Sequence, residues 1–233
     1  MSDLTYAIGD IHGCADALIR LLERIDDHAR GRAAVIVCLG DYVDRGPDSA
    51  GVIRILRTRQ AASHGTMICL RGNHEQMMLD AQRDVCDAPA WLANGGIETL
   101  RSFGAADAGE LPDEVLTWIS ALPTVHEDAG RYYVHAGFRP GCRGIDPDVT
   151  ARLWIREPFL GSNYDFGKHV VHGHTPQRNG RPDARSFRTN LDTACVYGQA
   201  LTAGVFTTAS SGPVEFLQAP RDTPQMSDRT GRP

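Results

Sequence analysis

Five short motifs in this sequence place Asp, Asn or His beside glycine, and each of them directly follows an apolar run. The motifs are GDIHG (9–13), GDYVDRG (40–46), GNHE (72–75), HAG (135–137) and HGHT (172–175). Together they offer carboxylate, carboxamide and imidazole groups without a thiolate, a ligand set that suits Mn²⁺, Fe or Zn²⁺ better than Ca²⁺. Because these groups outnumber the ligands of one tetrahedral ion, we expect two ions, with a carboxylate and an activated water between them.

The spacing of the first three motifs indicates that they meet in space. Asp10, Asp41 and Asn73 follow one another at intervals of roughly 30 residues, which is the length of one strand–helix–strand unit. In an open α/β sheet, sites form outside the carboxyl ends of the strands. Parallel neighbours would therefore bring these three side chains together, and the adjacent glycines let the backbone approach a ligand closely.

Each motif also has a plain structural explanation when it is taken alone. An Asp near a His at a strand end is more often a turn residue beside a core histidine than a pair of ligands. Five such coincidences at five strand ends explain the whole set poorly, so we interpret it as one site. His172 stays open between a functional and a packing role. The remaining histidines outside the motifs, at 28, 64, 126 and 169, are assigned to packing or to the surface.

The segments between the motifs have clear strand and helix patterns. Apolar strands are predicted at 4–10, 33–41 and 65–73, with helices at 14–31, 47–60 and 74–84. These strands are continuous apolar runs, as is typical of parallel strands that are buried on both faces. A helical stretch over 88–123, interrupted at 94–96, precedes predicted strands at 131–137, 169–174, 186–193, 194–206 and 214–218. This order predicts a single α/β domain over 1–218 and a disordered tail over 219–233.

The composition excludes several classes of protein. The net charge of the 233 residues is -5, whereas proteins that bind nucleic acid usually carry a basic surface, so we expect no nucleic-acid partner. No apolar stretch approaches the roughly 20 residues that span a bilayer, so we expect no membrane segment. The start, MSDLTYAIGD, lacks the features of a secretory signal, and the six cysteines are scattered. We therefore expect a cytoplasmic protein without disulfides.

In this order, GDIHG, GDYVDRG, RGNHE, HAG and GHT closely resemble the motifs of the metallophosphoesterase superfamily. More narrowly, they resemble the PPP serine/threonine protein phosphatases in their compact bacterial and phage form. The resemblance extends from about Asp10 to Thr175. It implies a calcineurin-like α/β sandwich of two mainly mixed β-sheets flanked by helices, with the metal site at the carboxyl ends of the strands.

The resemblance also implies which residues bind the metal ions. The ligands would be Asp10 and His12 for the first ion, Asp41 for both ions, and Asn73, His135 and His174 for the second ion. In HGHT, the family ligand is the histidine directly before Thr175, which favours His174 over His172. We expect the two divalent ions to be Mn²⁺, with Fe or Zn²⁺ as alternatives.

Other motif residues resemble the family's groups for the proton and the phosphate. His74 matches the general acid, and Asp44 matches the carboxylate that orients it. Arg45 matches a phosphate-binding arginine, and LWIRE (153–157) resembles the segment that supplies a second one, Arg156. Asn73 would contact the phosphate as well as a metal ion. Arginine suits this task because its planar guanidinium donates two parallel hydrogen bonds to phosphate oxygens.

The implied activity is metal-dependent hydrolysis of phosphoesters, foremost of phosphoserine and phosphothreonine in proteins, with phosphotyrosine as a further substrate. A metal-bridging hydroxide would attack phosphorus directly, without a phosphoenzyme. One alternative is a symmetrical bis(5'-nucleosyl)-tetraphosphatase, which shares GDxHGC, here ending at Cys14; Asp44 and Glu75 favour the protein-phosphatase pattern. The other is a non-catalytic metal-binding regulator, which the complete motif set disfavours.

The resemblance carries expectations about partners and about the shape of the cleft. Phosphorylated proteins or small phosphoesters are the expected partners, and no obligatory regulatory subunit is expected in a chain of this length. The helical stretch over 88–123 and the segment SNYDFGKH (162–169) lie between ligand-bearing strands. We therefore expect both of them to form walls of the substrate cleft.

Overall fold

The first β-sheet carries the three parallel strands that the sequence predicts. In the computed structural model, which describes residues 4–221, the strand order of this sheet is β10-β9-β1-β2-β3. Its parallel strands are β1 (Leu4–Ile8), β2 (Ala34–Cys38) and β3 (Met67–Cys69), and its antiparallel strands are β9 (Ala200–Thr207) and β10 (Ser210–Pro220). Because β1, β2 and β3 are neighbours, their carboxyl ends meet at one edge of the sheet.

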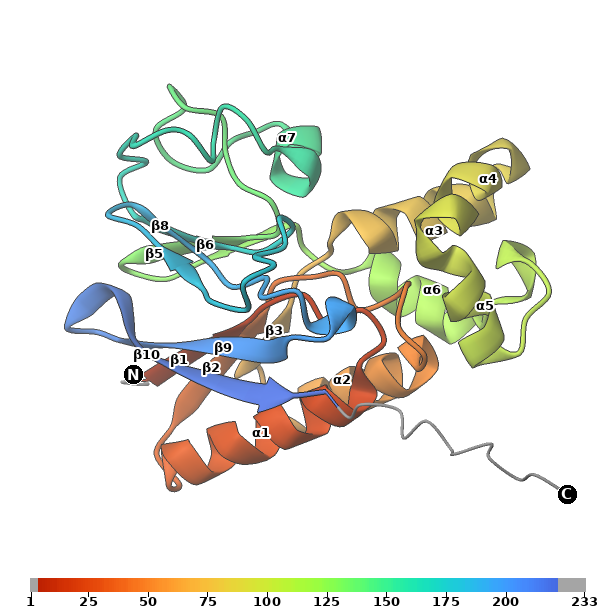
Figure 1. Ribbon diagram of the computed structural model, residues 1–233, viewed down its shortest axis with the longest axis horizontal. Coiled ribbons are helices and arrows are strands. Elements are labelled where there is room, and N and C mark those ends of the chain that lie inside the picture. The colour runs from red at the N-terminus through yellow and green to blue at the C-terminus, as the bar shows by residue number, and fades with distance from the viewer. Residues whose placement is uncertain (1–3, 222–233) are drawn as a thin grey trace, which may run out of the picture.

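The second sheet has the order β4-β5-β6-β8-β7. Its strands are β4 (Val125–Glu127), β5 (Arg131–Val134), β6 (His169–His172), β7 (Asp183–Ala184) and β8 (Arg188–Asn190). The central strands β5, β6 and β8 are parallel, and β4 and β7 are antiparallel edge strands. The two mixed sheets are stacked on each other (Figure 1), which confirms the predicted α/β sandwich.

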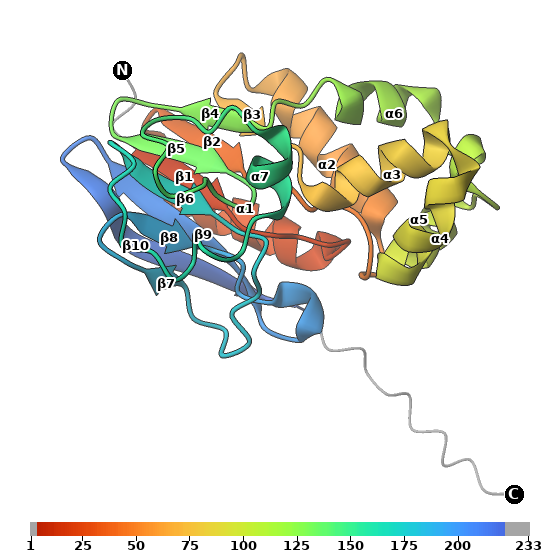
Figure 2. The same cartoon turned by 90° about the horizontal axis from the view of Figure 1, so that it is seen from above.

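Helices cover the first sheet and extend beyond its carboxyl edge. Helices α1 (Ala15–Ala29) and α2 (Ser49–Ala62) connect the parallel strands and lie on the outer face of the first sheet (Figure 1). Helix α3 (Asn73–Arg83) begins shortly after β3 and groups with α4 (Ala88–Trp91), α5 (Ile97–Phe103) and α6 (Asp113–Ser120) at one end of the molecule (Figure 2). Among the described residues, no helix combines the length and the apolar character needed to cross a membrane.

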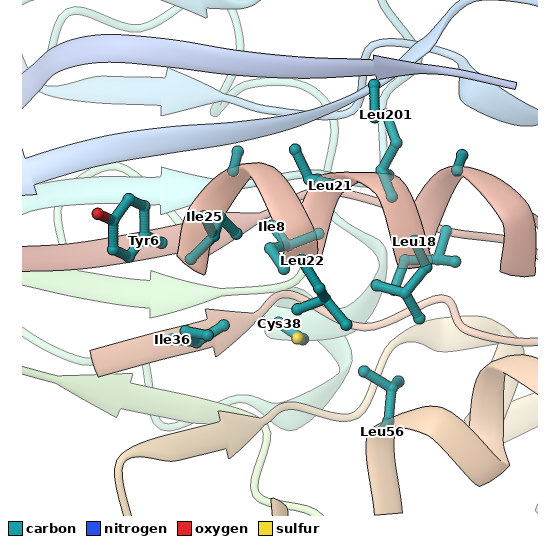
Figure 3. Close-up of a cluster of buried hydrophobic side chains, with 14 of the residues drawn as sticks. Tyr6, Ile8, Leu18, Leu21, Leu22, Ile25, Ile36, Cys38, Leu56 and Leu201 are labelled. Atoms are coloured by element: carbon teal, nitrogen blue, oxygen red, sulfur yellow. The ribbon is translucent and has the colours of Figure 1, made fainter. Parts of the chain in front are cut away.

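The outer face of the first sheet is sealed by the apolar side of α1. Leu18, Leu21, Leu22 and Ile25 recur at the spacing of one helix face and are at most 4% exposed. They pack against side chains of β1 and β2 and against α2 (Figure 3). Full burial of a Leu or Ile side chain contributes about 1.5–3 kcal/mol. The helix pattern read from the sequence therefore corresponds to a real core face.

A second apolar layer lies between the two sheets. It consists of Ala7, Val37, Leu39, Leu70, Tyr133, Val171, Leu191 and Phe206, all fully buried. Strands β1 and β2 therefore bury side chains on both faces. This explains why they appear in the sequence as unbroken apolar runs instead of alternating patterns.

The helical stretch over 88–123 is confirmed, with its interruption at the predicted glycines. It contains α4 (Ala88–Trp91), α5 (Ile97–Phe103) and α6 (Asp113–Ser120). Between α4 and α5, Gly95 has a φ of 110°, a left-handed conformation that favours glycine. A side chain at Gly95 would also collide with Arg45, whose backbone N–H donates to the Gly95 carbonyl at 3.2 Å. The interruption thus lets this stretch lie against the GDYVDRG loop.

Several predicted boundaries are wrong. Strand β10 runs to Pro220 and Ala219 is fully buried against the sheet, so the ordered chain continues past the expected end at 218. The predicted tail beyond 221 lies outside the described residues, and the single domain over 1–218 stays a prediction.

The strand predicted at 194–206 begins only at Ala200, because Cys195–Tyr197 form a short 3₁₀ helix between left-handed Ala194 and Gly198. Helix α7 (Val149–Trp154) and strands β4 and β7 were not predicted.

Candidate metal centre and catalytic residues

Five strand ends from the two sheets deliver the predicted motifs to one place. Two groups of buried side chains could each hold a metal ion. Within each group, the potential ligand atoms all lie within 4.8 Å of one another. One group is His12, Asp41 and His74, and the other is Asp41, His135 and His174. Asp41 is common to both groups. The arrangement therefore offers two adjacent cation positions that share one carboxylate, as the sequence predicts for a two-metal centre.

The backbone of these motifs is held in unusual conformations. His12, Asp41, Asp44, Arg45 and His174 all have positive φ values, between 44° and 73°. Such conformations are uncommon for residues other than glycine and persist only where the surroundings enforce them. They turn the chain sharply after each strand. As a result, several polar side chains point into the same small volume.

Asp10 lies beside these two groups, in contact with the HGHT loop. Both of its carboxylate oxygens accept from the backbone N–H of His174, at 3.2 and 3.1 Å. A Cβ on Gly173 would collide with the Asp10 carboxylate, so glycine is needed there. Burial, together with the neighbouring carboxyls of Asp192 and Asp41, raises the pKa of Asp10 well above its ordinary value. A nearby cation would offset this cost.

The histidine hydrogen bonds leave nitrogen lone pairs directed at the other candidate ligands. The Nδ1 atoms of His12 and His135 donate to the carbonyls of Val43 and Leu39, at 2.8 and 3.0 Å. This fixes the neutral tautomer in which Nε2 is an acceptor. Nε2 of His135 then faces two other acceptors, Oδ1 of Asn73 at 2.8 Å and Oδ1 of Asp41 at 3.3 Å.

Three acceptors that face one another are the surroundings of a cation, so the residues present fit a metal ion. Asn73 Oδ1 is also 2.9 Å from Nδ1 of His174, which brings the last predicted ligand to the same point. Burial lowers the pKa of His12 and of His174 to about 3, and it also lowers that of His135. These three imidazoles are therefore neutral, the form in which histidine binds metals.

His74 differs from the other three histidines. Its Nδ1 lies 2.7 Å from Oδ2 of the fully buried Asp44. Burial lowers the pKa of His74, but the carboxylates of Asp41 and Asp44 outweigh burial and raise the pKa above its ordinary value. Its Nε2 lies 3.9 Å from Oδ2 of Asp41, at the edge of the site. Distance alone would allow His74 to bind a metal, but its pKa and its partner suit a proton donor.

Two residues that the sequence did not suggest complete the surroundings of Asp44. The indole N–H of Trp91 donates to both carboxylate oxygens, at 3.0 and 3.1 Å, and the hydroxyl of Thr99 donates to Oδ1 at 2.7 Å. Both residues belong to the helical stretch after α3. Nothing in their local sequence marks them as functional, because a buried Trp and Thr in a helix are ordinary core residues.

Glu75 connects two of the motif loops. Its buried carboxylate accepts from the backbone N–H groups of Asp41, Tyr42 and Gly72, at 2.8, 2.7 and 2.8 Å. Burial, followed by the charge of Asp41, raises the pKa of Glu75 to about 7. The side chain therefore fixes the Asp41 loop to the start of α3 and takes no place among the candidate ligands.

Asp192 is a further acidic residue that sequence reasoning missed. It follows β8, the neighbour of β6, and is 5% exposed. Burial raises its pKa to about 6, and its carboxyl group forms a hydrogen bond with that of Asp10. Only part of the signal was present: Asp192 stands at the end of a predicted strand, as the motif residues do, but the strand itself, Arg188–Asn190, is polar.

The two neighbouring histidines of HGHT separate clearly. His172 is fully buried and its ring lies 4.9 Å from that of Phe159, with Nη1 of Arg188 3.4 Å from its Nε2. Burial lowers its pKa well below the ordinary value, so it is neutral. Within the described chain it belongs to neither group of candidate ligands. His172 is therefore a core residue, whereas His174 lies at the site.

A cleft of about 330 Å³ opens onto these residues. Its lining residues include Asp41, Asn73, His74 and His174, together with the two predicted arginines, Arg45 and Arg156. Nη1 of Arg45 lies 2.8 Å from Nε2 of His12, next to the candidate metal positions. The cleft thus combines acceptors for cations with donors for an anion, as hydrolysis of a phosphoester requires.

The prediction that the segment over 162–169 forms a wall of the cleft is wrong. Asn94 of the helical stretch does line the cleft, but the described lining includes no residue from 162–169. Tyr164 and Phe166 of that segment instead pack in an apolar cluster with Phe138 and Phe159. The wall on that side comes from Trp154, the last residue of α7, and from Arg156.

Comparison with known proteins agrees with this geometry. The family described as calcineurin-like phosphoesterase matches residues 5–200. Serine/threonine-protein phosphatase 1 of Salmonella typhimurium is 33% identical over 207 residues, which cover 84% of this chain and 89% of that protein. The asymmetrical bis(5'-nucleosyl)-tetraphosphatase PrpE of Halalkalibacterium halodurans is 28% identical over 257 residues, with 95% and 96% covered.

The fold is shared with a solved structure from a eukaryote. A protein serine/threonine phosphatase from Saccharomyces cerevisiae has a TM-score of 0.65 and 12% identity, and the match covers 94% of this chain and 80% of that one. At this identity the likeness concerns the fold alone. The family match, in contrast, spans most of the sequence and includes every motif of the site. The chain therefore belongs to the calcineurin-like phosphoesterase family, a family of phosphoester hydrolases.

Proposed function

We propose that this protein is a metal-dependent phosphatase that hydrolyses phosphoserine and phosphothreonine in proteins. The observation that carries the proposal is the sharing of Asp41 by two groups of candidate ligands, beside the His74–Asp44 pair. The relative from Salmonella typhimurium, named a serine/threonine-protein phosphatase, supports the choice of substrate. Another relative is named a bis(5'-nucleosyl)-tetraphosphatase, so dinucleoside tetraphosphates are the competing substrate.

Asp10, His12, Asp41, Asn73, His135 and His174 are the residues that would hold the ions. When bound, two divalent ions supply positive charge that activates a water and stabilises the phosphoryl oxygens. Oxygen and imidazole ligands without thiolate support Mn²⁺ as the proposed ion. The six free thiols are in keeping with the cytoplasmic location that we propose.

The protein's own side chains would handle the anion and the proton. Arg45 and Arg156 line the cleft and bind the phosphoryl oxygens that do not react. His74, protonated at Nε2, gives its proton to the leaving oxygen of the serine or threonine side chain. Asp44 accepts from Nδ1 of His74 and so fixes the ring with Nε2 directed into the cleft.

A comparison of substrates under one set of conditions tests the proposal. The purified protein is incubated with Mn²⁺ and with p-nitrophenyl phosphate, a phosphoserine peptide or diadenosine tetraphosphate, and kcat/KM is measured for each. We expect the peptide to be the best natural-type substrate. A higher kcat/KM for diadenosine tetraphosphate would replace the proposal with the tetraphosphatase activity. Failure to hydrolyse any of the three would indicate a non-catalytic metal-binding protein.

A further inference from the structure

A third arginine lies on the wall of the cleft, outside all of the motifs. Arg178 lines the same cleft as Arg45 and Arg156. Its Cζ is 5.5 Å from the centre of the Tyr197 ring, and Cζ of Arg45 is 5.9 Å from the centre of the same ring. Both distances are within the range of a cation–π contact. One aromatic ring thus joins the arginine next to the candidate metal site to a second arginine further along the wall.

The backbone holds Arg178 and Tyr197 next to each other. The N–H of Gln177 donates to the Asp192 carbonyl at 2.8 Å, and the side-chain amide of Asn190 donates to the Thr175 carbonyl at 2.7 Å. These bonds tie the loop after His174 to the loop after β8. Because both loops are fixed to strands that carry site residues, Arg178 is positioned before any substrate arrives.

The charge of Arg178 is not neutralised within the described chain. Arg131, Arg139 and Arg188 each have an aspartate oxygen within 3.1 Å. No carboxylate of the described residues lies within ion-pair distance of Arg45, Arg156 or Arg178. The cleft therefore concentrates three cationic side chains, which attracts substrates with more than one negative group.

We propose that Arg178, supported by the half-exposed ring of Tyr197, is a specificity residue that binds a second anion next to the scissile phosphoryl group. The inference rests on the proposed function, in which two other arginines already serve the scissile group. In a phosphoprotein, the second anion is the carboxylate of an Asp or Glu that flanks the phosphorylated residue. In a dinucleoside polyphosphate, the neighbouring phosphate has the same chemistry.

The test compares paired peptides on the wild type and three variants. The peptides contain phosphoserine and differ only in a flanking Glu or Gln, and kcat/KM is measured for both. Arg178→Ala and Arg178→Lys alter the residue, and Arg181→Ala removes an exposed arginine of the same loop as a control. We expect the wild type and Arg181→Ala to prefer the Glu peptide about tenfold, as for a charge-assisted hydrogen bond. The ratio should approach one in Arg178→Ala and be partly kept in Arg178→Lys.

The outcomes separate this inference from the proposed function. A wild-type kcat/KM ratio of the Glu to the Gln peptide near one would overturn the role of Arg178. So would an unchanged ratio in Arg178→Ala, or an equal loss of kcat/KM on both peptides.

If neither peptide is hydrolysed but diadenosine tetraphosphate is, the proposed function fails. The variants are then compared on diadenosine tetraphosphate and p-nitrophenyl phosphate. A selective loss on the former in Arg178→Ala supports the second-anion site, whereas equal changes overturn it. Hydrolysis of p-nitrophenyl phosphate alone would also overturn it.

Discussion

The indole N–H of Trp91 donates to both carboxylate oxygens of Asp44, from a position 47 residues further along the chain. Asp44 in turn accepts from Nδ1 of His74 at 2.7 Å. A tryptophan in the helical stretch over 88–123 therefore contacts the group that orients the proposed general acid. This relationship gives that stretch a function beyond forming a wall of the cleft.

Replacement of this donor should impair the chemical step more than substrate binding. In Trp91→Phe an aromatic ring is kept but the Asp44 carboxylate loses the hydrogen bond that fixes its orientation, so the direction of the His74 ring is less fixed. We expect kcat to fall about tenfold, the size of one lost hydrogen bond to a charged group, with KM and metal content unchanged. Without the Trp91 donor, the negative charge of the Asp44 carboxylate is less stabilised, so Asp44 becomes a stronger hydrogen-bond acceptor for His74. This should raise the pKa of His74.

Trp118→Phe is the matched control for this experiment. The indole N–H of Trp118 donates to Gln60 at 2.8 Å, and neither residue lines the cleft. Steady-state kinetics of p-nitrophenyl phosphate hydrolysis across a pH series would measure kcat, KM and the alkaline pKa for both variants. Equal kcat values in Trp91→Phe and the wild type would show that the bond to Asp44 has no catalytic role.

The contact between Trp91 and Asp44 also shows where sequence reasoning reaches its limit. Unbroken apolar runs located the parallel strands, because neighbouring residues such as Val37 and Cys38 are buried on opposite faces of the sheet. The rule that polar residues gather at carboxyl strand ends located Asp10, Asp41 and Asn73, and it would have located Asp192. It could not find Trp91, because a hydrogen bond from a distant helix depends on how the helix packs, which no local pattern encodes.

The loop that carries Tyr197 was mispredicted for a different reason, which is local. Ala194 to Gln199 resemble the start of a strand, since most of them are apolar. In the structure, however, the Asp192 carboxylate accepts from the N–H of Ala194 at 3.0 Å, and Ala194 is left-handed with a φ of 62°. This local hydrogen bond competes with strand formation and turns the chain toward the cleft.

The protonation state of His74 predicts the alkaline side of the pH profile. The active form is protonated, and Asp41 and Asp44 together outweigh burial and hold its pKa above the ordinary value of about 6.5. Activity should therefore persist through neutral pH and decline as the pH rises through that raised pKa. In His74→Asn, kcat should fall by about 10²–10⁴ and the alkaline decline should disappear.

Metal analysis decides whether His74 is an acid or a ligand. The His74→Asn protein is dialysed against Mn²⁺ and then against buffer, and its bound metal is measured by mass spectrometry. We expect the same metal content as in the wild type. Loss of an ion from this variant would mean that His74 belongs to the coordination sphere, as its distance from Asp41 also permits.

Asp41→Asn should disturb both metal positions, because Asp41 is the residue that the two groups of ligands share. The amide lacks the charge of the carboxylate and has only one oxygen to offer. We expect the affinity for both ions to fall by more than about tenfold. His135→Ala, which alters one group only, should mainly weaken one ion. Titration of each variant with Mn²⁺ would count the sites, and loss of a single ion from Asp41→Asn would contradict the bridging role.

The pair His172→Gln and His174→Gln tests the separation of the two HGHT histidines by different measurements. Nδ1 of His174 lies 2.9 Å from Oδ1 of Asn73, another candidate ligand, so replacement of His174 should lower metal content and activity. His172 packs against Phe159 and Arg188 in the core, so its replacement should lower the free energy of unfolding by about 1–3 kcal/mol, the cost of a badly paired buried polar group. Chemical denaturation and metal analysis of both variants would show this crossed pattern. Metal loss in His172→Gln with unchanged stability would mean that the structure assigns the two histidines the wrong way round.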